Sequence, residues 1–405
     1  MPFSELGLHP ELLKAIAEAK YAIPTPIQSA AIPPILRAKD VQACAQTGSG
    51  KTAAFALPML QKLVSGAAAR NRSAAEEIPR SAGGATRGDR LVSGLVLVPT
   101  RELAIQVGET FRSLGRYLPR PIKVLTVFGG VSINPQMMAL RGGADIVVAT
   151  PGRLLDLADH NAVRLSDVST LVLDEADRLL DEGFADELSR VLALLPDRRQ
   201  NLLFSATFPP AVRSLAELLL RDPVRVDVTT ATVAGTPPEI QQRSIAVDPE
   251  RRTQLLRYLI RHHGWERTLV FVATKYATEH IARKLQRLGF AARALHGDLS
   301  QGARTEALAD FKAGRVGVLI ATDVAARGID VVDLAAVVNF DLPRSTADYV
   351  HRIGRTGRAG ASGVAVSFVT AAMEAHFRLI EKRNRFRLER EKVRGFEPRK
   401  STAAP

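Results

Sequence analysis

A glycine-rich segment near the N-terminus has the composition of a phosphate-binding loop. Residues 45–52 read Ala-Gln-Thr-Gly-Ser-Gly-Lys-Thr and fit the pattern G-x-x-x-x-G-K-[ST] except for alanine at the first position. Backbone amides and a helix N-terminus would face the phosphates, Lys51 would reach the β- and γ-phosphates, and Thr52 would offer its hydroxyl to Mg²⁺. The alternative is an ordinary glycine-rich turn before a helix. The residues expected to line the nucleotide here are Gln46, Thr47, Gly48, Ser49, Gly50, Lys51 and Thr52.

A second chemical signal is an acidic pair that directly follows an apolar run. Asp174 and Glu175 come after residues 171–173. Carboxylates at the carboxyl end of a strand face the crevice where α/β sheets bind ligands. We therefore expect Asp174 to hold Mg²⁺ through water and Glu175 to orient or deprotonate an attacking water. Alternatively, acidic residues at this place would simply complement a helix N-terminus.

The elements that must position these residues are short apolar runs that alternate with helical patterns. Such runs are typical of strands buried on both faces, and the alternation predicts mainly parallel α/β sheets flanked by helices. The rhythm occupies both halves of the chain, so we expect two similar domains. The helix after the phosphate loop should run through Leu57 and kink or end at Pro58. The clearest runs are 95–98, 146–149, 171–173, 202–204, 269–272, 318–321 and 336–340.

Composition limits the class of protein. The chain has 405 residues, 46% of them apolar and 24% charged, which predicts a globular protein of two or three domains. A single cysteine, Cys44, excludes an internal disulfide and a cysteine-based zinc site. Since no apolar run approaches the ~18–20 residues of a membrane span, and Glu5 and Glu11 stand where a signal peptide needs positive charge, we predict a cytoplasmic protein with no membrane partner.

The domain organisation follows from where periodicity fails. We predict a first domain over residues 1–228, a linker over 229–240 that is rich in glycine and proline, and a second domain over 241–380. A basic, flexible tail is expected over 381–405. The segment 65–90 has no apolar face and is predicted to be a mobile surface loop.

Charge points to a polyanionic partner. The net charge is +13, which favours nucleic acid because neutralised phosphates release condensed counterions. The last 28 residues hold part of this excess, and there Phe386, Leu388 and Phe396 lie among arginines and lysines. Such a mixture suits phosphates and unstacked bases. A solvated, solubilising tail is the alternative.

The acidic pair belongs to the tetrad Asp-Glu-Ala-Asp at 174–177, and with the phosphate loop it resembles the DEAD-box ATP-dependent RNA helicases. The resemblance covers about residues 3–370, through many motifs in the family's order. Residues 91–106 and 129–140 resemble the bacterial RhlE-like branch. The family implies two tandem RecA-like domains that use ATP and Mg²⁺ and bind the RNA backbone with little sequence preference.

The resemblance assigns an adenine-reading motif to residues 21–28. It implies that Gln28 hydrogen-bonds the adenine edge and that Tyr21 stacks on the ring. Lys20 departs from the family pattern, since glycine usually precedes the aromatic residue. In the second domain the resemblance implies that Asp330 accepts a hydrogen bond from the ribose of ATP.

The resemblance also assigns RNA contacts to turns that follow predicted strands. Each turn alone would more often be a simple helix cap, but their order matches the family. Hydroxyls, guanidinium groups and bare backbone at such turns suit phosphates. The implied RNA-binding residues are Pro99, Thr100, Arg101, Gly130, Thr150, Arg153, Thr274, Gly297, Thr322 and Arg327.

Three arginines within seven residues near position 355 fit poorly inside an apolar core and either face solvent or meet anions. The resemblance implies that Arg355 and Arg358 are arginine fingers, which join Lys51, Asp174 and Glu175 as the catalytic set. It further implies a group that couples hydrolysis to strand separation between the domains: Asp177, Ser205, Thr207, His351 and Arg352.

The expected activity is ATP-dependent RNA unwinding. Closure of two domains on ATP, Mg²⁺ and RNA would bend one strand and open short duplexes locally, or remodel RNA–protein complexes. Two alternatives stay open: an ATP-dependent clamp that holds RNA without separating strands, and a motor that acts on DNA. Ribosome-assembly or RNA-degradation proteins are candidate partners. The sequence gives no signal for oligomeric state or for a specific RNA.

Overall fold

The chain folds into two compact units. The computed structural model describes residues 2–45, 48–74, 90–181, 183–228, 240–326, 334–357 and 363–399. The units are Met1–Val233 and Ala234–Pro405, so the division falls within the predicted linker. Residues 229–239 of that linker lie outside the described residues, whereas Ile240 already belongs to a strand.

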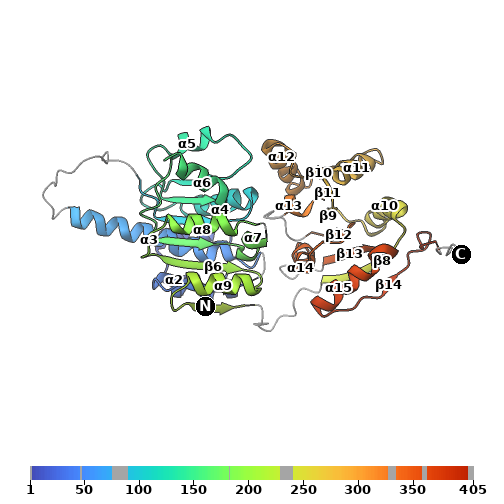
Figure 1. Ribbon diagram of the computed structural model, residues 1–405, viewed down its shortest axis with the longest axis horizontal. Helices are drawn as coiled ribbons and strands as arrows, with labels where there is room; N and C mark the ends of the chain where they lie inside the picture. Colours follow the sequence, from blue (N-terminus) through green and yellow to red (C-terminus); the bar gives the residue numbers. More distant parts are fainter. Residues whose placement is uncertain are drawn as a thin grey trace. The chain divides into compact units, whose positions relative to one another are not determined.

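The first unit is a seven-stranded sheet with helices on both faces (Figure 1). Its strand order is β3-β4-β2-β5-β6-β1-β7, and every described pair is parallel. The elements are η1 (Phe3–Leu6), α1 (Pro10–Glu18), α2 (Pro26–Leu36), β1 (Val41–Cys44), α3 (Lys51–Ala74), β2 (Gly94–Leu97), α4 (Arg101–Leu114), β3 (Val124–Val127), α5 (Asn134–Leu140), β4 (Ile146–Ala149), α6 (Pro151–Asp159), β5 (Thr170–Leu173), α7 (Ala176–Asp181), α8 (Ala185–Ala193), β6 (Gln200–Ser205), α9 (Pro210–Leu219) and β7 (Val224–Asp227).

The second unit repeats this architecture. Its strand order is β10-β11-β9-β12-β13-β8-β14, again parallel throughout the described pairs. The elements are β8 (Ile240–Ala246), η2 (Pro249–Arg251), α10 (Arg252–His263), β9 (Thr268–Phe271), α11 (Lys275–Gln286), β10 (Ala292–Leu295), α12 (Gln301–Lys312), β11 (Val318–Ala321), α13 (Asp323–Ala326), β12 (Ala336–Asn339), α14 (Thr346–Ile353), β13 (Gly363–Val369), η3 (Ala371–Met373), α15 (Glu374–Asn384) and β14 (Arg390–Glu391).

The central strands bury both of their faces, as the apolar runs predict. Along β2, Val96 packs into one core cluster, while Leu95 and Leu97 pack into the cluster on the opposite face. In the second unit Val270 and Phe271 of β9 divide in the same way. Successive side chains of a strand point to opposite faces, so helices must cover both. The predicted fold class, two parallel α/β sheets flanked by helices, is confirmed.

The helix does not end at Pro58, and the alternative prediction of a kink there stays a prediction. Helix α3 continues through Pro58 to Ala74. Proline removes one helical donor, but Leu57, Met59 and Leu60 are buried in the first core, and this packing outweighs the missing hydrogen bond.

The predicted loop over residues 65–90 is therefore helical at its start. Residues 65–74 belong to α3, and residues 75–89 lie outside the described residues. Arg90 is fixed by an ion pair of 2.5 Å between its Nη1 and Asp145 Oδ2.

The prediction of a flexible tail is wrong for residues 381–399. Helix α15 extends to Asn384, and β14 then pairs with β8. Phe386 and Leu388 pack against one core cluster of the second unit, and Phe396 packs against another. Apolar residues at alternate positions give the segment an inward side, so these aromatic rings are partly buried and contact the core. Residues 400–405 lie outside the described residues.

Within the described residues, none of the helices combines the length and the apolar character of a membrane-spanning segment.

Candidate nucleotide and nucleic-acid sites

The predicted phosphate loop connects β1 to α3, which begins at Lys51. The Lys51 side chain is buried, and its Nζ donates a hydrogen bond of 2.9 Å to the carbonyl of Ala45. Gly48 and Gly50 have φ of +78° and +93°, a region that favours glycine. The backbone thus curves around the ammonium group as a phosphate loop requires. Gln46 and Thr47 lie outside the described residues.

Gln28 holds this loop in place. It is buried in the first turn of α2, where its Oε1 accepts a hydrogen bond of 2.9 Å from the Thr25 amide. Its Nε2 donates to the carbonyl of Gly50 over 3.2 Å. A Cβ at Gly50 would lie 2.5 Å from that nitrogen, so only glycine fits. The predicted adenine reader is therefore coupled to the phosphate loop, while its second amide hydrogen and second lone pair stay available for a base edge.

The residue that precedes the predicted stacking tyrosine has a left-handed backbone. Lys20 has φ of +58° and follows the last turn of α1. The amides of Lys20 and Tyr21 donate back to the carbonyls of Ala17 and Ile16 over 3.0 and 3.1 Å. This pattern closes a helix with the residue type that is usually glycine. Tyr21 itself is 39% exposed, as a stacking surface must be.

The two predicted catalytic carboxylates follow β5 and are both buried. Asp174 Oδ1 accepts a hydrogen bond of 3.0 Å from the Glu175 amide. Burial raises the pKa of Asp174 to about 7, against the opposing charge of nearby Lys51. Glu175 has φ of +53°, a strained conformation for a non-glycine residue. A buried carboxylate that is costly to ionise is one that a metal cation would stabilise.

Asp177 is joined to the Ser-Ala-Thr segment, as predicted for the coupling group. Its Oδ2 accepts hydrogen bonds from the Thr207 amide and hydroxyl at 3.0 and 2.7 Å. The Asp177 amide donates to Ser205 Oγ over 3.2 Å, and Ser205 Oγ donates to the Thr207 carbonyl over 2.7 Å. The turns after β5 and β6 are thereby held together in one hydrogen-bonded network.

Thr100 and Thr150 stand at the N-termini of α4 and α6, after β2 and β4. Thr100 caps its helix by accepting from the Leu103 amide over 3.3 Å, and Pro99 before it is buried. Arg101 lies against Gly130, whose φ is +73°. Any Cβ at Gly130 would overlap the guanidinium. The structure therefore brings an arginine and the bare backbone of the glycine doublet together at one edge of the sheet.

Arg153 is buried in the first turn of α6. Its Nη2 donates to the carbonyl of Val131 over 2.7 Å, and its Nε lies 3.5 Å from Asp156 Oδ2. The side chain thus ties α6 to the loop after Gly130, while its buried Nε and Nη1 make no hydrogen bond within the described residues.

The second unit places Thr274, Gly297 and Thr322 after β9, β10 and β11. Thr274 caps α11 by accepting from the Ala277 amide over 3.1 Å. Arg327 and Asp330 lie outside the described residues.

One ion pair in this region was not predicted. Lys275 Nζ lies 2.5 Å from Asp298 Oδ1 and lowers the pKa of that carboxyl. It links the residue after Thr274 to the residue after Gly297. Opposite charges beside two predicted RNA-binding turns were the available signal.

Arg352, a member of the predicted coupling group, makes its described contacts within the second unit. It is buried, and its guanidinium forms two 2.6 Å contacts to Asp323, with further bonds to Asn339 Oδ1 at 3.0 Å and the Asp341 carbonyl at 2.7 Å. The group also lies over the Phe271 ring. These contacts hold β9, β12, α13 and α14 together, and the coupling role of Arg352 stays a prediction.

The other predicted arginines differ in what can be described. Arg355 is buried at the end of α14, and His351 is half-buried in that helix. Arg358 lies outside the described residues.

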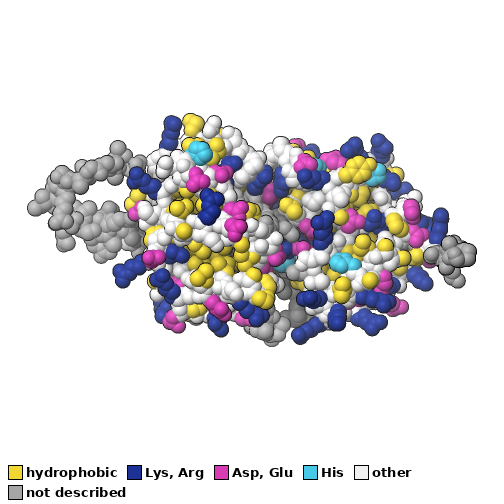
Figure 2. All heavy atoms as spheres, in the orientation of Figure 1, with side chains coloured by type: hydrophobic (Ala, Val, Ile, Leu, Met, Phe, Trp, Pro, Cys, Tyr) yellow, Lys and Arg dark blue, Asp and Glu magenta, His cyan; other side chains and the backbone are white. Residues whose placement is uncertain are grey.

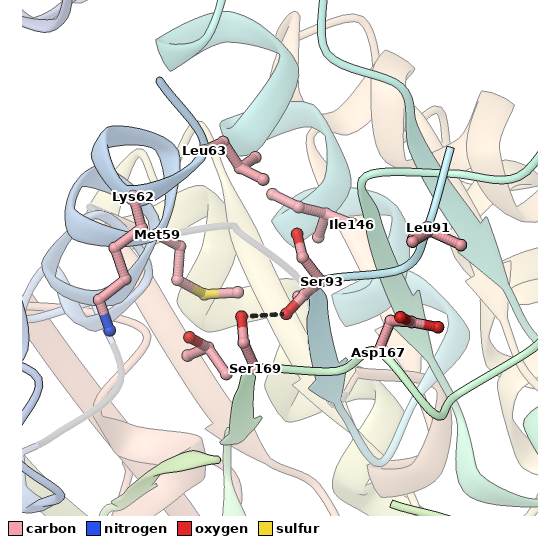
Figure 3. A pocket seen from close by; sticks show the side chains of 10 residues that line it. Met59, Lys62, Leu63, Leu91, Ser93, Ile146, Asp167 and Ser169 are labelled. Atoms are coloured by element: carbon pink, nitrogen blue, oxygen red, sulfur yellow. Dashed lines mark hydrogen bonds between the residues drawn. The ribbon is translucent and has the colours of Figure 1, made fainter. Parts of the chain in front are cut away.

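A pocket of the first unit is remote from the predicted site residues of that unit. Its volume is about 380 Å³, and Met59, Leu63 and Ile146 form its apolar wall. Ser93 and Ser169 precede β2 and β5, and the Ser169 hydroxyl donates to the Ser93 carbonyl over 3.1 Å (Figure 3). Lys62 also borders the pocket, and burial lowers its pKa to about 8. The pocket lies at the amino ends of the strands, opposite the edge that carries the predicted site.

Comparisons with known proteins agree with this arrangement. The family model of DEAD/DEAH box helicases matches residues 25–215, and that of the helicase conserved C-terminal domain matches residues 251–360. The ATP-dependent RNA helicase DeaD of Mycobacterium tuberculosis is 43% identical over 383 residues, which are 95% of this chain. The chain spans only 63% of that relative's length.

Two further proteins extend the match. The DEAD-box ATP-dependent RNA helicase CshA of Geobacillus kaustophilus is 40% identical over 390 residues, 96% of this chain and 78% of the relative. The structure of Saccharomyces cerevisiae Dbp5 bound to RNA and ADP BeF3 superposes with a TM-score of 0.80 at 33% identity, covering 96% of this chain and 95% of Dbp5. The likeness to the RhlE-like branch stays a prediction. The chain belongs to the DEAD-box ATP-dependent RNA helicase family.

Proposed function

We propose that this chain is an RNA-stimulated ATPase that unwinds short RNA duplexes locally or remodels RNA–protein complexes. The observation that carries the proposal is the grouping of buried Lys51, Asp174 and Glu175 at the carboxyl edge of one sheet. A buried ammonium suits the β- and γ-phosphates, and Glu175 is placed to hold or deprotonate the attacking water. RNA as a partner is supported by the family and by the RNA that Dbp5 binds.

Mg²⁺ fits the residues present. Asp174 is 2% exposed, and its raised pKa marks a carboxylate whose burial the nearby charge of Lys51 offsets only in part. Asp174 and the Thr52 hydroxyl are the residues that would hold the ion. Once bound, it would neutralise charge on the phosphates during transfer. The chain's own part is to present an ionised Asp174 beside Lys51 and to keep Glu175 oriented in its strained turn.

The remaining parts of the machinery divide between the units. Tyr21 and Gln28 would recognise adenine, and the Asp177–Thr207 network would relay the state of the hydrolysis turns to the RNA-binding turns. Arg355 and Arg358, with Asp330, would come from the second unit. Hydrolysis would then require both units to engage the same ATP, and RNA and ATP would each strengthen binding of the other by the same factor.

The RNA would be held through its backbone. Thr100, Arg101, Gly130, Thr150 and Arg153 of the first unit contribute hydroxyls, guanidinium groups and bare backbone at one sheet edge. Thr274, Gly297 and Thr322, with Arg327, contribute the equivalent turns of the second. Such contacts position phosphates and read little sequence. Ribosome-assembly or RNA-degradation proteins as partners and a cytoplasmic location belong to the proposal as well.

The decisive experiment measures ATP turnover of the full chain with and without single-stranded RNA, beside DNA of equal length. We expect low turnover alone, a rise with RNA and a smaller rise with DNA, because contacts to 2′-hydroxyls distinguish RNA. Equal turnover with and without RNA would overturn the proposal. Equal stimulation by DNA would favour a DNA motor.

A second assay separates unwinding from clamping. A short duplex with a labelled strand should release that strand when ATP is added. RNA-stimulated turnover without strand release would favour the clamp. Replacing Arg355 with Gln should lower turnover far more than ATP affinity, and the reverse would remove it from the catalytic set.

A further inference from the structure

The segment after α15 is fixed along the outer side of β8. Phe386 stacks on Tyr349 with ring centroids 5.4 Å apart. Ser244 Oγ of β8 donates to the Glu389 carbonyl over 2.8 Å, and β14 pairs in register with Ser244 and Ile245. The inward side of the segment is therefore committed to the core of the second unit.

Ion pairs fix the same segment. Arg390 bonds Glu374 and Glu381 over 2.9 to 3.2 Å, with its guanidinium over the Phe377 ring. Arg243 bonds Glu391 through a contact of 2.6 Å. These charges are paired within the unit, so they do not contribute to an external binding surface.

A different set of cations points outward, and we name it the basic strip. All its members are exposed, and none of their side chains makes a hydrogen bond or an ion pair within the part of the chain that the structure describes. Figure 2 shows Lys and Arg side chains gathered over the region that Figure 1 labels α15 and β14. The basic strip consists of Lys382, Arg383, Arg385, Arg387, Lys392 and Arg394.

The lack of partners distinguishes the strip from several paired arginines of the same unit. Arg252, Arg315 and Arg352 each have a carboxylate within 2.7 Å. Six unpaired cations within 13 residues repel one another and raise the local positive potential. Lys382 and Arg387 also line a groove of about 670 Å³ between α15 and the extended segment, where Glu389 is an exposed acid. An anionic ligand would relieve the repulsion.

The strip leads to the edge that carries the candidate RNA contacts. Arg251 bonds the Gly395 carbonyl, and the Arg399 amide donates to Asp248 Oδ2 over 3.0 Å. Asp248 follows the carboxyl end of β8. Thr274 follows β9, and β14 lies four strands further across the sheet. This separation is roughly 19 Å at ~4.8 Å between neighbouring strands. That distance is on the order of six nucleotides at a helical rise of ~3.4 Å.

We propose that the basic strip binds the phosphate backbone of RNA that extends past the motif contacts of the second unit. The proposal rests on RNA as the substrate in the proposed function. Base stacking is not part of the proposal, because Phe386 and Phe396 are partly buried against the core of the unit. The strip would act as a folded, sequence-independent anchor.

The test uses three double variants of the full chain, each of which removes two positive charges. Arg385→Gln/Arg387→Gln and Lys392→Gln/Arg394→Gln alter the strip, and Lys284→Gln/Arg287→Gln alters exposed residues toward the end of α11. Truncation is unsuitable because it would remove β14 and uncover β8. RNA affinity is measured against salt for a short oligonucleotide and for one extended by at least six nucleotides, and thermal unfolding checks the fold.

For the extended RNA, each strip variant should lose affinity on the order of tenfold at about 0.1 M salt. The salt slope should fall by up to about 1.4, at ~0.7 per lost single-strand contact. The short RNA and the α11 variant should bind as the wild type does. The proposal would be overturned if the strip variants bound the extended RNA as tightly as the α11 variant does. It would also be overturned if they lost binding to an acidic peptide but kept their affinity for the RNA. If the short RNA did not stimulate ATP turnover of the wild-type chain, the proposed function would be overturned instead.

Discussion

The strands of the first unit follow the order β3-β4-β2-β5-β6-β1-β7, and those of the second follow β10-β11-β9-β12-β13-β8-β14. Position by position the two orders match, so each strand of one unit has an equivalent in the other. Thr100 and Thr274 both cap the helix after the equivalent strands β2 and β9. Thr150 and Thr322 likewise follow β4 and β11. The turns proposed to hold RNA are thus present twice.

The hydrolysis turns are present once. After β1 the first unit has the glycine-rich loop and Lys51, whereas after the equivalent β8 the second unit has Asp248 and a turn of 3-10 helix. Glu175 and Asp341 both stand two residues beyond equivalent strands. Asp341 accepts from Arg252 Nη1 at 2.5 Å and from the Ala273 amide at 2.8 Å, so it serves the internal structure. In the proposed function the same sheet edge would bind a polyanion in both units, whereas among the described residues the lysine and the acidic pair proposed for phosphoryl transfer lie in the first unit.

The most direct test of this comparison replaces each of the two equivalent carboxylates by its amide, in two separate variants. Glu175→Gln should lower ATP turnover by ~10²–10⁴, because a base or water-orienting group is lost, while ATP binding and the RNA-bound lifetime are kept or increased. Asp341→Asn should retain turnover within a few fold and lower the free energy of unfolding by roughly 1–3 kcal/mol. Steady-state turnover and denaturant unfolding of both variants measure this. Equal losses of turnover would mean that the two edges are not functionally distinct.

The tie between the last strand and its sheet gives the next largest effect. Arg390 holds the pKa of Glu381 and of Glu374 below its usual range through hydrogen bonds. Because both pKa values are depressed in the folded state, this stabilisation is complete above the ordinary carboxyl pKa and is lost as pH falls through the folded values. Arg390→Met should lower the free energy of unfolding by roughly 2–3 kcal/mol at about pH 7.

The pH dependence supplies its own control. The difference between Arg390→Met and the wild type should shrink toward about pH 3, where the carboxyls are protonated. Arg378→Met removes a more exposed partner of Glu374 and should change the free energy of unfolding by less than about 1 kcal/mol. A constant difference from neutral to acid pH would show that packing of Arg390, and not its charge, fixes β14.

The glycines beyond β3 and β10 offer a gentler test. Gly130 has φ of +73° and lies against Arg101, whereas a Cβ at Gly297 would meet nothing closer than Lys275 Cε at 4.0 Å. Gly130→Ala should lower the free energy of unfolding by roughly 1–2 kcal/mol. Gly297→Ala should change it by less than about 0.5 kcal/mol. Thermal unfolding compares the two, and similar losses would contradict the different crowding of the two turns.

The central strands could be predicted from sequence because they bury both faces. Runs such as 146–149 and 318–321 coincide with β4 and β11. Strands β3 and β10 lie at sheet edges and bury only their first and last residues, so their sequences lack a continuous apolar run. Strand β14 is two residues long and highly charged, so its sequence predicted a tail and not a strand.

The candidate site could be predicted where a short segment carries the chemistry, as with Lys51 and Asp174. It could not be predicted where a distant partner decides the role. Arg352 stands among arginines in the sequence, and only the fold shows that Asp323 and Asn339 occupy its donors. The six cations of the basic strip lack such partners, although nothing in the sequence distinguishes them from Arg390.

The smallest predicted effect concerns how a helix ends in each unit. Lys20, two residues after α1, has φ of +58°, and Gly264, directly after α10, has φ of +61°. The amides after them close equivalent bonds, from Tyr21 to Ile16 at 3.1 Å and from Trp265 to Ile260 at 3.2 Å. A side chain in this conformation costs about 1 kcal/mol, and a Cβ at Gly264 would meet no neighbour, so the backbone alone decides the outcome.

Lys20→Gly should therefore raise the free energy of unfolding by about 0.5–1 kcal/mol, and Gly264→Lys should lower it by a similar amount. Chemical denaturation of each variant at two salt concentrations separates this backbone effect from the change in charge, because backbone strain does not depend on ionic strength. A gain for Lys20→Gly that disappears at high salt would assign the effect to the lysine charge. If the gain persists, ATP affinity should be measured on the same variant, since Lys20 fixes the turn that presents Tyr21.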